Sequence, residues 1–456
     1  MGVKPVKKGE IIELTIDDVA YGGDAVGRVE GFAIFVPGGL PGERVLAQIK
    51  EVKNSFARAE FLKVKEGSKN RQEAKCFVYE ECGGCQLQHA NYEAQLAYKK
   101  SMVEDALERI GGIEVEVNSP IGMEYPYFYR NKAQFPVDKQ DDEVVIGFYA
   151  AGSHEIIDTN NCKIQHPLIN RVARKAKEAI KKYELSVYNE KEHTGLVRHL
   201  VVRVGVCTNQ AMLVLVTKDK AVTHKKELAD KLIEEIPELV SVYQNINPEK
   251  TNVVFGKETE KLAGEDYIID YIGRVKYQIS PRSFFQVNTL QAEELYEQVL
   301  KYADLSKEEV VIDAYCGLGS ISLYLASKAK EIFGIEVIEE AVKMARKNAK
   351  LNRIENCLFK VGKVEELLPK MSANVDPDVV VVDPPRKGCS KEVLAAFTEL
   401  DPKRIVYVSC DPTSLARDLD RLEELGYKTR EVQPVDMFSQ TYHIENVAWL
   451  EKVISC

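Results

Sequence analysis

Three cysteines lie within ten residues of one another: Cys76, Cys82 and Cys85. Two glycines separate the second from the third, and they let the backbone fold tightly enough for the three sulfur atoms to converge. A metal site needs a fourth ligand, and we select Cys162, which lies in a polar segment shortly before a His-Pro pair. Four thiolates suit either tetrahedral zinc or an iron-sulfur cluster, and the single Cys-x-x-Cys pair favours iron and sulfur. Buried thiols without a metal are the alternative interpretation.

A second chemical pattern lies in residues 310–320, where an apolar run leads through Asp313 into a glycine turn. A strand that feeds such a turn at the start of a helix forms a cradle for a nucleotide cofactor. The turn lacks the third glycine of a pyrophosphate-binding turn, which favours S-adenosylmethionine over a dinucleotide. Glu336 ends the next apolar run and can accept hydrogen bonds from both ribose hydroxyls. The alternative for Glu336 is a solvated strand end.

Two further positions follow apolar runs in this half of the chain. Asp383 begins an Asp-Pro-Pro-Arg sequence directly after residues 379–382, and Cys410 comes after residues 405–408. In an open α/β sheet such runs end at the edge where ligands bind, so we expect both side chains to face the cofactor. Methyltransferases that act on amino groups have an aromatic residue after the prolines. This chain has Arg386 there, which argues against an exocyclic amine as the target.

Cys410 is placed to act as a nucleophile, although a lone cysteine at a strand end is more often a packed, inert thiol. A thiolate that adds to carbon 6 of uracil creates an enolate, and carbon 5 of that enolate can attack an electrophilic methyl group. A base must then remove the proton from carbon 5. Glu445, which we expect in a polar loop before the last strand, is the nearest candidate for that base.

The segments around these residues predict three structural units. Residues 10–63 contain five short strand-like runs separated by glycine-rich turns, which predicts a small barrel like those that bind oligonucleotides, or else a passive spacer. Residues 92–110 have a helical pattern that ends at two glycines, and residues 120–280 mix strand-like runs with one amphipathic helix. From residue 309 onward, apolar runs alternate with helical patterns, which predicts a parallel sheet covered on both faces.

Composition narrows the class of protein. The chain has 456 residues with 62 basic and 71 acidic side chains, and its net charge of -9 argues against a protein that coats a polyanion over its whole surface. No apolar run approaches the ~20 residues of a membrane span, and the N-terminus lacks the apolar core of a signal peptide. We therefore expect a soluble cytoplasmic protein whose ten cysteines serve metal binding or chemistry rather than disulfides.

Together these motifs resemble, over essentially the whole chain, the TrmA/RlmD-type RNA uracil-5-methyltransferases. The resemblance implies an N-terminal TRAM barrel that helps to grip RNA and a 4Fe-4S cluster held by the four cysteines. It implies that Cys410 is the nucleophile and Glu445 the base. It also implies S-adenosylmethionine contacts from Gln286, in a Phe-Gln-Val-Asn sequence, and from Tyr315, Glu336 and Asp383. Asp383 would also face the target uracil.

The resemblance implies an α/β fold class with three domains. Residues 4–63 would form the TRAM RNA-binding barrel, which is similar to an oligonucleotide-binding barrel. Residues 64–280 would form a central α+β domain with the iron-sulfur site, whose helix near 92–112 packs on the catalytic domain. Residues 281–456 would form a Rossmann-like, class I methyltransferase domain.

Relatives that carry a cluster generally modify 23S ribosomal RNA. The resemblance therefore implies a monomeric enzyme, without a membrane partner, that methylates carbon 5 of flipped-out uridines in 23S RNA, as the Gram-positive RlmCD-type members do at two sites. The same reaction on transfer RNA is one alternative, and an RNA-binding assembly factor without catalysis is another. A radical S-adenosylmethionine enzyme is disfavoured because a fourth cysteine would close the open iron site that such an enzyme needs.

Overall fold

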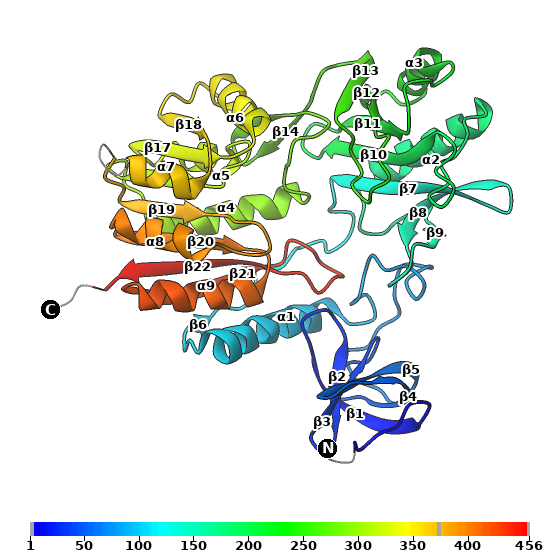
Figure 1. Cartoon of the computed structure of the whole chain (residues 1–456), viewed down its shortest axis with the longest axis horizontal. Helices are drawn as coiled ribbons and strands as arrows, with labels where there is room; N and C mark the ends of the chain where they lie inside the picture. Colours follow the sequence, from blue (N-terminus) through cyan, green and yellow to red (C-terminus); the bar gives the residue numbers. More distant parts are fainter. Residues whose placement is uncertain (1–3, 372–374, 454–456) are drawn as a thin grey trace.

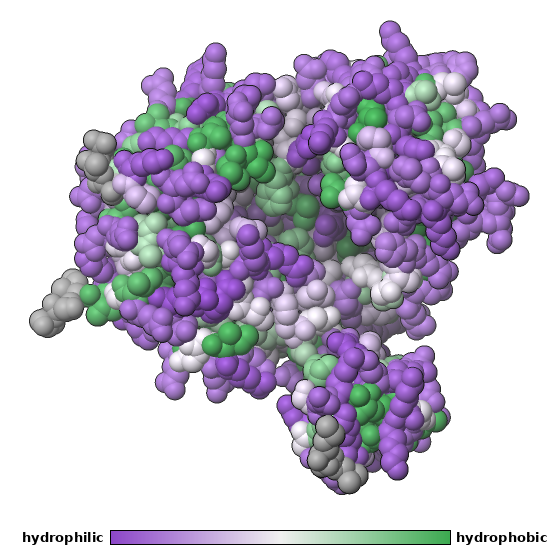
Figure 2. Space-filling model, viewed as in Figure 1, coloured by the Kyte–Doolittle hydropathy of each residue, from purple (hydrophilic) through white to green (hydrophobic). Residues whose placement is uncertain are grey.

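The computed structural model describes residues 4–371 and 375–453, which form three units along the chain (Figure 1). A small N-terminal barrel stands at one end, and the central and C-terminal parts lie beside each other above it. Figure 2 shows a recess between those two parts, on a surface that is otherwise mostly polar. Among the described residues, no helix has the length and apolar character needed to cross a membrane.

Five strands close the N-terminal barrel in the order β1-β2-β3-β5-β4, which confirms the predicted barrel. They are β1 (Ile11–Val19), β2 (Ala25–Val29), β3 (Phe32–Val36), β4 (Arg44–Val52) and β5 (Phe56–Glu66). Inward-facing side chains such as Leu14, Ile34 and Val45 fill the interior and are almost fully buried. The barrel is therefore a packed unit with its own core.

A seven-stranded sheet in the order β13-β12-β11-β10-β7-β8-β9 forms the central part. The strands are β7 (Lys132–Gln140), β8 (Glu143–Tyr149), β9 (Ile156–Asp158), β10 (Val197–Gly205), β11 (Gln210–Thr217), β12 (Leu239–Ile246) and β13 (Glu258–Gly264). Helices α2 (Pro167–Lys182) and α3 (Lys225–Glu235) share a core with one face. On the other face, Val201, Met212 and Val214 pack in the same core as the C-terminal part. The two parts are therefore joined by a continuous apolar contact.

The C-terminal sheet has the strand order β18-β17-β16-β19-β20-β22-β21-β6, in which β22 is antiparallel to both neighbours. Its main strands are β16 (Val310–Ala314), β17 (Glu331–Glu336), β18 (Cys357–Val361), β19 (Val379–Val382), β20 (Arg404–Ser409), β21 (Tyr427–Val435) and β22 (Glu445–Lys452). The helices are α4 (Thr289–Ala303), α5 (Ser320–Leu325), α6 (Glu339–Leu351), α7 (Val364–Met371), α8 (Lys391–Glu399) and α9 (Pro412–Glu424). Separate cores cover the two faces, as predicted from the continuous apolar strands.

Segments that come earlier in the sequence complete this C-terminal part. Strand β6 (Glu116–Val117) pairs with β21 at the edge of the sheet. Helix α1 (Tyr92–Ala106) continues into a π-helical turn, Leu107–Gly111, and shares a core with α9. The hairpin of β14 (Ile268–Ile272) and β15 (Val275–Ile279) packs in one core with α4. The helix predicted at residues 92–110 is confirmed, and the domain limits at residues 63 and 280 stay predictions.

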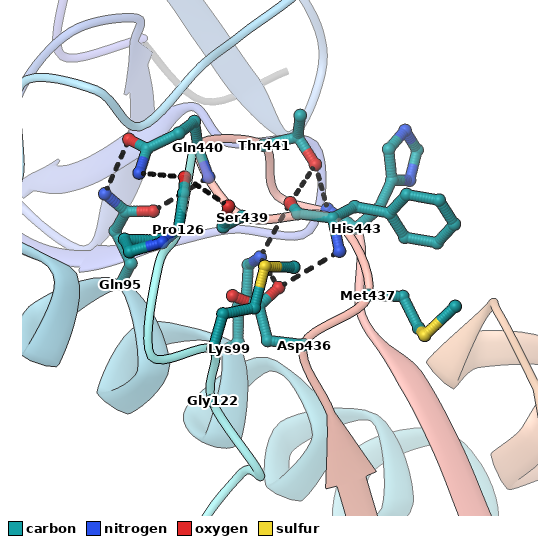
Figure 3. Close-up of polar contacts among 12 residues, drawn as sticks. Gln95, Lys99, Gly122, Pro126, Asp436, Met437, Ser439, Gln440, Thr441 and His443 are labelled. Carbon is teal, nitrogen blue, oxygen red and sulfur yellow. Dashed lines mark hydrogen bonds and ion pairs between the residues drawn. The ribbon is translucent and has the colours of Figure 1, made fainter. Parts of the chain in front are cut away.

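A buried ion pair ties α1 to residues 436–444, which connect β21 to β22 and which we call the 436–444 loop (Figure 3). The Nζ atom of Lys99 donates to Asp436 Oδ1 at 2.6 Å and to the carbonyl oxygen of Phe438 at 3.1 Å. Both charged side chains are 0% exposed, and the Tyr92 hydroxyl donates to the second Asp436 oxygen at 2.8 Å. Because a buried charge is costly without its partner, this pair fixes the start of the loop.

One turn earlier on α1, Gln95 forms a reciprocal pair with Gln440 (Figure 3). The Nε2 atom of Gln95 donates to Gln440 Oε1 at 3.1 Å, and the backbone N–H of Gln440 donates to Gln95 Oε1 at 3.0 Å. Gln440 has a φ of 69°, a left-handed conformation that needs such support in a residue with a side chain. The 436–444 loop is therefore attached to α1 at both its start and its middle.

Replacing Lys99 with Met should leave Asp436 as an unpaired buried charge and weaken the attachment of the loop by about 3 to 5 kcal/mol. Amide hydrogen exchange measures this, since protection of residues 436–444 should fall. Lys100→Met is the matched control, because Lys100 follows on the same helix and pairs at the surface with Glu104 at 3.6 Å, a contact worth less than about 1 kcal/mol. Unchanged protection in Lys99→Met would show that other contacts hold the loop.

Candidate functional site

Four of the predicted site residues lie at one edge of the C-terminal sheet. Tyr315 follows β16, Glu336 ends β17, Asp383 follows β19, and Cys410 follows β20. The strand order β17-β16-β19-β20 makes the carboxyl ends of these parallel strands neighbours. Ligands bind at this edge in open α/β sheets, so the structure brings these side chains to the expected place.

The turn between β16 and α5 has a left-handed backbone at Tyr315, Gly317 and Gly319, with φ values of 65°, 55° and 81°. A Cβ atom on Gly319 would lie 2.9 Å from the ring of Phe359, so this position requires glycine. A Cβ atom on Gly317 would meet nothing within 4 Å, and the Gly317 amide donates to Glu336 Oε2 at 3.2 Å. The turn is therefore an open cradle bordered by a carboxylate, which suits a nucleoside.

Asp313, the fourth residue of β16, lies buried below this turn. The Ser322 amide donates to its Oδ2 atom at 3.0 Å, whereas the Oδ1 atom is buried and has no partner in the described part of the chain. Burial, with a smaller effect from the charge of Glu336, raises the pKa of Asp313 to about 7. The sequence pattern included this residue without giving it a role, and its free oxygen fits a ligand that brings a hydrogen-bond donor.

The Phe-Gln-Val-Asn segment lies between the central sheet and the 436–444 loop. Asn131 donates from its amide to the carbonyl of Val287 at 2.8 Å and from Nδ2 to the carbonyl of Gln286 at 2.8 Å. Asn288 begins α4 as its N-cap and donates to the carbonyl of Met437 at 3.1 Å. The side chain of Gln286 is buried. The charge of Asp383 raises the pKa of the Tyr296 hydroxyl, and a hydrogen bond with Gln286 lowers it. Gln286 is thus brought close to the strand-end residues.

Cys410 and Glu445 lie in one electrostatic environment with Asp383 and Arg386. Burial, together with the charges of Glu445 and Asp383, raises the pKa of the Cys410 thiol to about 12. Burial also raises the pKa of Glu445 to about 8, with a second contribution from Asp383. Arg386 lowers both values, so it is the cation that favours the thiolate and the carboxylate. From the sequence, Arg386 was interpreted only as the absence of an aromatic residue, although its position in the Asp-Pro-Pro-Arg loop could have indicated this role.

The prediction that Glu445 lies in a polar loop is wrong, because Glu445 is the first residue of β22 and is buried. It pairs across the sheet with Val435, the last residue of β21. The preceding residues are polar and indicated a loop that continues through Glu445. In the structure they form local hydrogen bonds, such as Thr441 Oγ1 to the carbonyl of Phe438 at 2.7 Å, and the strand begins directly after them. The strand therefore starts at Glu445 and holds its carboxyl group in a fixed, dry position.

The four predicted cysteine ligands line one cavity of about 460 Å³. Burial, with smaller contributions from the charges of other cysteines in the set, raises the pKa of Cys85 to about 12 and that of Cys162 to about 11. This mutual effect indicates that the four cysteines lie near one another. Within residues 4–371 and 375–453, no three His, Cys, Asp or Glu side chains are arranged so that they could hold a single metal ion.

Part of the 436–444 loop also lines this cavity. Thr441, Tyr442 and His443 line it, and these are the residues just before Glu445. The amides of Gln86 and Leu87, which follow Cys85, both donate to the carbonyl of Gln440 at 3.0 Å. The cysteine site and the Glu445 site therefore share one loop, which their separate sequence motifs did not indicate.

Comparisons with known proteins agree with this geometry. Residues 91–453 match the model of the tRNA (uracil-5-)-methyltransferase family, and residues 5–62 match that of the TRAM domain. An uncharacterized RNA methyltransferase from Clostridium tetani is 51% identical over 97% of this chain and 96% of its own length, and one from Halalkalibacterium halodurans is 48% identical over 98% of both. The crystal structure of Pyrococcus abyssi tRNA (uracil-54, C5)-methyltransferase with S-adenosyl-L-homocysteine has a TM-score of 0.77 and 28% identity, and the match covers 96% of this chain and all of that one.

The raised pKa of Glu445 predicts a pH-dependent stability. Above the ordinary carboxyl pKa the unfolded chain releases this proton, while the folded chain keeps it until about pH 8, so the folded state loses stability as the pH rises through that window. Glu445→Gln removes this loss, and its thermal midpoint should exceed that of the wild type more at about pH 9 than at about pH 5.

Glu451→Gln is the matched control, because Glu451 lies on the same strand and pairs with Arg430 at 3.2 Å near the surface. The difference in thermal midpoint between Glu451→Gln and the wild type should not increase with pH. An equal difference between Glu445→Gln and the wild type at both pH values would contradict the assignment of a protonated, buried Glu445.

Proposed function

Because the chain belongs to the tRNA (uracil-5-)-methyltransferase family and is therefore an RNA methyltransferase, we propose that it methylates carbon 5 of specific uridines in 23S ribosomal RNA. The observation that carries this proposal is the grouping of Cys410, Glu445 and Asp383 beside the glycine cradle. A nucleophile, a buried carboxyl group and a cofactor site at one sheet edge are the parts that methylation of uracil at carbon 5 needs. Because ribosomal RNA is the proposed substrate, we expect the enzyme to act in the cytoplasm. We also expect it to be a monomer.

The residues at the cradle fit S-adenosylmethionine. Glu336 accepts hydrogen bonds from the amides of Gly317 and Ile338, which orient its carboxylate at the turn and leave further lone pairs for ribose hydroxyls. Gln286, Tyr315 and Asp383 would border the remainder of the cofactor. When bound, S-adenosylmethionine supplies a methyl group on a positively charged sulfur, which a carbon nucleophile can attack. The related structure with S-adenosyl-L-homocysteine supports this choice.

In the proposed reaction, the thiolate of Cys410 forms a bond to carbon 6 of uracil, which makes carbon 5 nucleophilic. Carbon 5 then takes the methyl group. Glu445 removes the proton from carbon 5, the bond from sulfur to carbon 6 breaks, and the double bond of the ring forms again. Arg386 favours the ionised forms of both residues, and the target base must leave the stack for Cys410 to reach it.

Transfer RNA is the second candidate substrate, because the related archaeal structure carries that activity in its name. The cluster-type cysteine motif favours 23S RNA through the family resemblance. Methyl transfer to purified 23S RNA and to unmodified transfer RNA, measured in parallel at equal uridine concentration, separates the two. We expect incorporation into 23S RNA, and incorporation into transfer RNA alone would overturn the choice of substrate.

The covalent step predicts a trapped species. RNA that carries 5-fluorouridine at the target cannot lose a proton from carbon 5, so the wild-type enzyme should form a methylated adduct that survives a denaturing gel. Cys410→Ala should form neither adduct nor product. Glu445→Gln should form an adduct on ordinary RNA, because only the elimination needs the base.

Cys389→Ala is the matched control for the trapping experiment, because Cys389 is a buried cysteine beyond the Asp383 loop. Its thiol accepts a hydrogen bond from Tyr407 at 3.7 Å and is not at a strand end. This variant should still form the adduct. Substantial methylation by Cys410→Ala, or a trapped peptide that contains Cys389, would show that the nucleophile is assigned wrongly.

We also propose that Cys76, Cys82, Cys85 and Cys162 hold a 4Fe-4S cluster. The shared cavity and the mutual effect of their charges support a group that all four thiolates bind. The hydrogen bonds from Gln86 and Leu87 to Gln440 give such a group a structural role, because it would hold the segment that supports the 436–444 loop. When bound, such a cluster would supply iron for the four thiolates to coordinate, and no step of the methyl transfer would use it.

Anaerobically purified protein should contain roughly four irons per chain and absorb broadly near about 400 nm. Cys162→Ser should lose this absorbance and most of the iron. Cys207→Ser is the matched control, because Cys207 is an exposed cysteine outside the cavity, and it should keep both. One zinc per chain without iron, or full iron content in Cys162→Ser, would rule out the proposed ligand set.

A further inference from the structure

The turn between β1 and β2 extends from the barrel to the catalytic edge of the C-terminal sheet. The Tyr21 hydroxyl donates to Asp411 Oδ2 at 3.0 Å, and Arg386 Nη2 donates to the Tyr21 hydroxyl at 3.4 Å. The ring of Tyr21 packs edge-to-face on that of Tyr442, with centroids 5.4 Å apart. Tyr21, a residue of the barrel, thus contacts Asp411, which follows the proposed nucleophile, and Tyr442, which lies shortly before the proposed base.

The backbone fixes this turn closely against the rest of the molecule. The Gly23 amide donates to the carbonyl of Ala20 at 3.0 Å, and Gly23 has a φ of 87°. A Cβ atom on Gly23 would lie 2.9 Å from Cβ of Gln86 and 3.5 Å from Cβ of Tyr442. Val19, just before the turn, is buried in one core with residues of α1. The barrel is therefore docked here by packing as well as by the Tyr21 hydroxyl.

The two partners of Tyr21 act directly on the catalytic residues. Asp411 follows Cys410 in the chain and caps α9, since its Oδ1 atom accepts hydrogen bonds from the amides of Thr413 at 3.0 Å and Ser414 at 3.1 Å. Arg386 is exposed at the tip of the Asp-Pro-Pro-Arg loop. The Tyr21 hydroxyl accepts a hydrogen bond from its guanidinium group and so helps to anchor it. Burial and the charge of Asp411 raise the pKa of Tyr21, so its hydroxyl keeps its proton and continues to donate.

We propose that Tyr21 is a positioning residue of the active site, which holds Arg386 beside Cys410 and Glu445 and fixes the Asp411 cap. This inference rests on the proposed chemistry of Cys410 and Glu445. It assigns to the barrel a part in the chemical step, beyond the affinity for RNA that its TRAM fold implies. The contacts of Tyr21 with Asp411, Arg386 and Tyr442 dock the barrel. In this proposal the same contacts complete the catalytic site.

Tyr21→Phe tests this, because it removes the hydroxyl and keeps the ring against Tyr442. With RNA that contains the target uridine, kcat should fall about tenfold, the effect of one hydrogen bond to charged groups, while KM changes less than about twofold. Tyr243→Phe is the matched control, because the Tyr243 hydroxyl donates to the carbonyl of Asp266 at 3.0 Å on the central sheet, away from the site. It should keep wild-type kcat and KM.

The pH dependence gives a readout that a loss of structure alone would not move. The groups that influence Cys410 are Glu445, Asp383, Arg386 and Asp411, and Arg386 is the one that lowers its pKa. Freed from Tyr21, Arg386 would stabilise the thiolate less, so the rise of the single-turnover rate with pH should shift to higher pH in Tyr21→Phe. If Tyr21 acts through Arg386, the double variant with Arg386→Met should be no slower than Arg386→Met alone.

Wild-type kcat and pH profile in Tyr21→Phe would overturn the inference. A change confined to KM would also overturn it and would assign Tyr21 to RNA binding instead. Both outcomes are distinct from a failure of the proposed function, in which the wild-type enzyme would leave carbon 5 of uridine unmethylated and form no adduct with Cys410.

Discussion

The buried pair of Lys99 and Asp436 determines where the 436–444 loop begins, and three parts of the molecule depend on that loop. Its residues form one wall of the cysteine cavity, and its end leads directly into Glu445. Its middle residue, Gln440, accepts hydrogen bonds from the amides that follow Cys85. A charge pair in a dry environment is tolerated only in a narrow range of geometries, so α1 transmits a fixed position to the catalytic edge.

Crowding of acidic groups is the second constraint. Asp313, Asp383 and Glu445 all have raised pKa values, about 7, 7 and 8, because each is taken out of water near another carboxyl group. The Cys410 thiol lies in the same field and is harder to ionise than a free cysteine. Arg386 lowers the pKa of both Cys410 and Glu445. This explains why a residue that holds Arg386 in place can affect the proposed methyl transfer. Such a site is less stable than a neutral one, a common feature of catalytic centres.

Much of the fold could be predicted from the sequence. The apolar runs before Tyr315, Asp383 and Cys410 are strands buried on both faces, and parallel strands of one sheet bring their carboxyl ends together. The start of β22 at Glu445 could not be predicted, because the polar residues before it satisfy one another locally. The burial of Lys99 was equally hidden, since its partner Asp436 lies 337 residues away in the sequence.

Contacts of this kind also explain why the proposed catalytic site involves more of the chain than its motifs suggest. Tyr21 and Asp411 are 390 residues apart, and no local pattern connects a barrel turn with the cap of α9. In the reaction that we propose, carbon 5 of uridine receives the methyl group. Release of tritium from 23S RNA labelled at carbon 5 of its uridines tests this most directly, with methyl incorporation measured in the same sample. We expect one tritium to be released for each methyl group gained, and methyl incorporation without tritium release would contradict methylation at carbon 5.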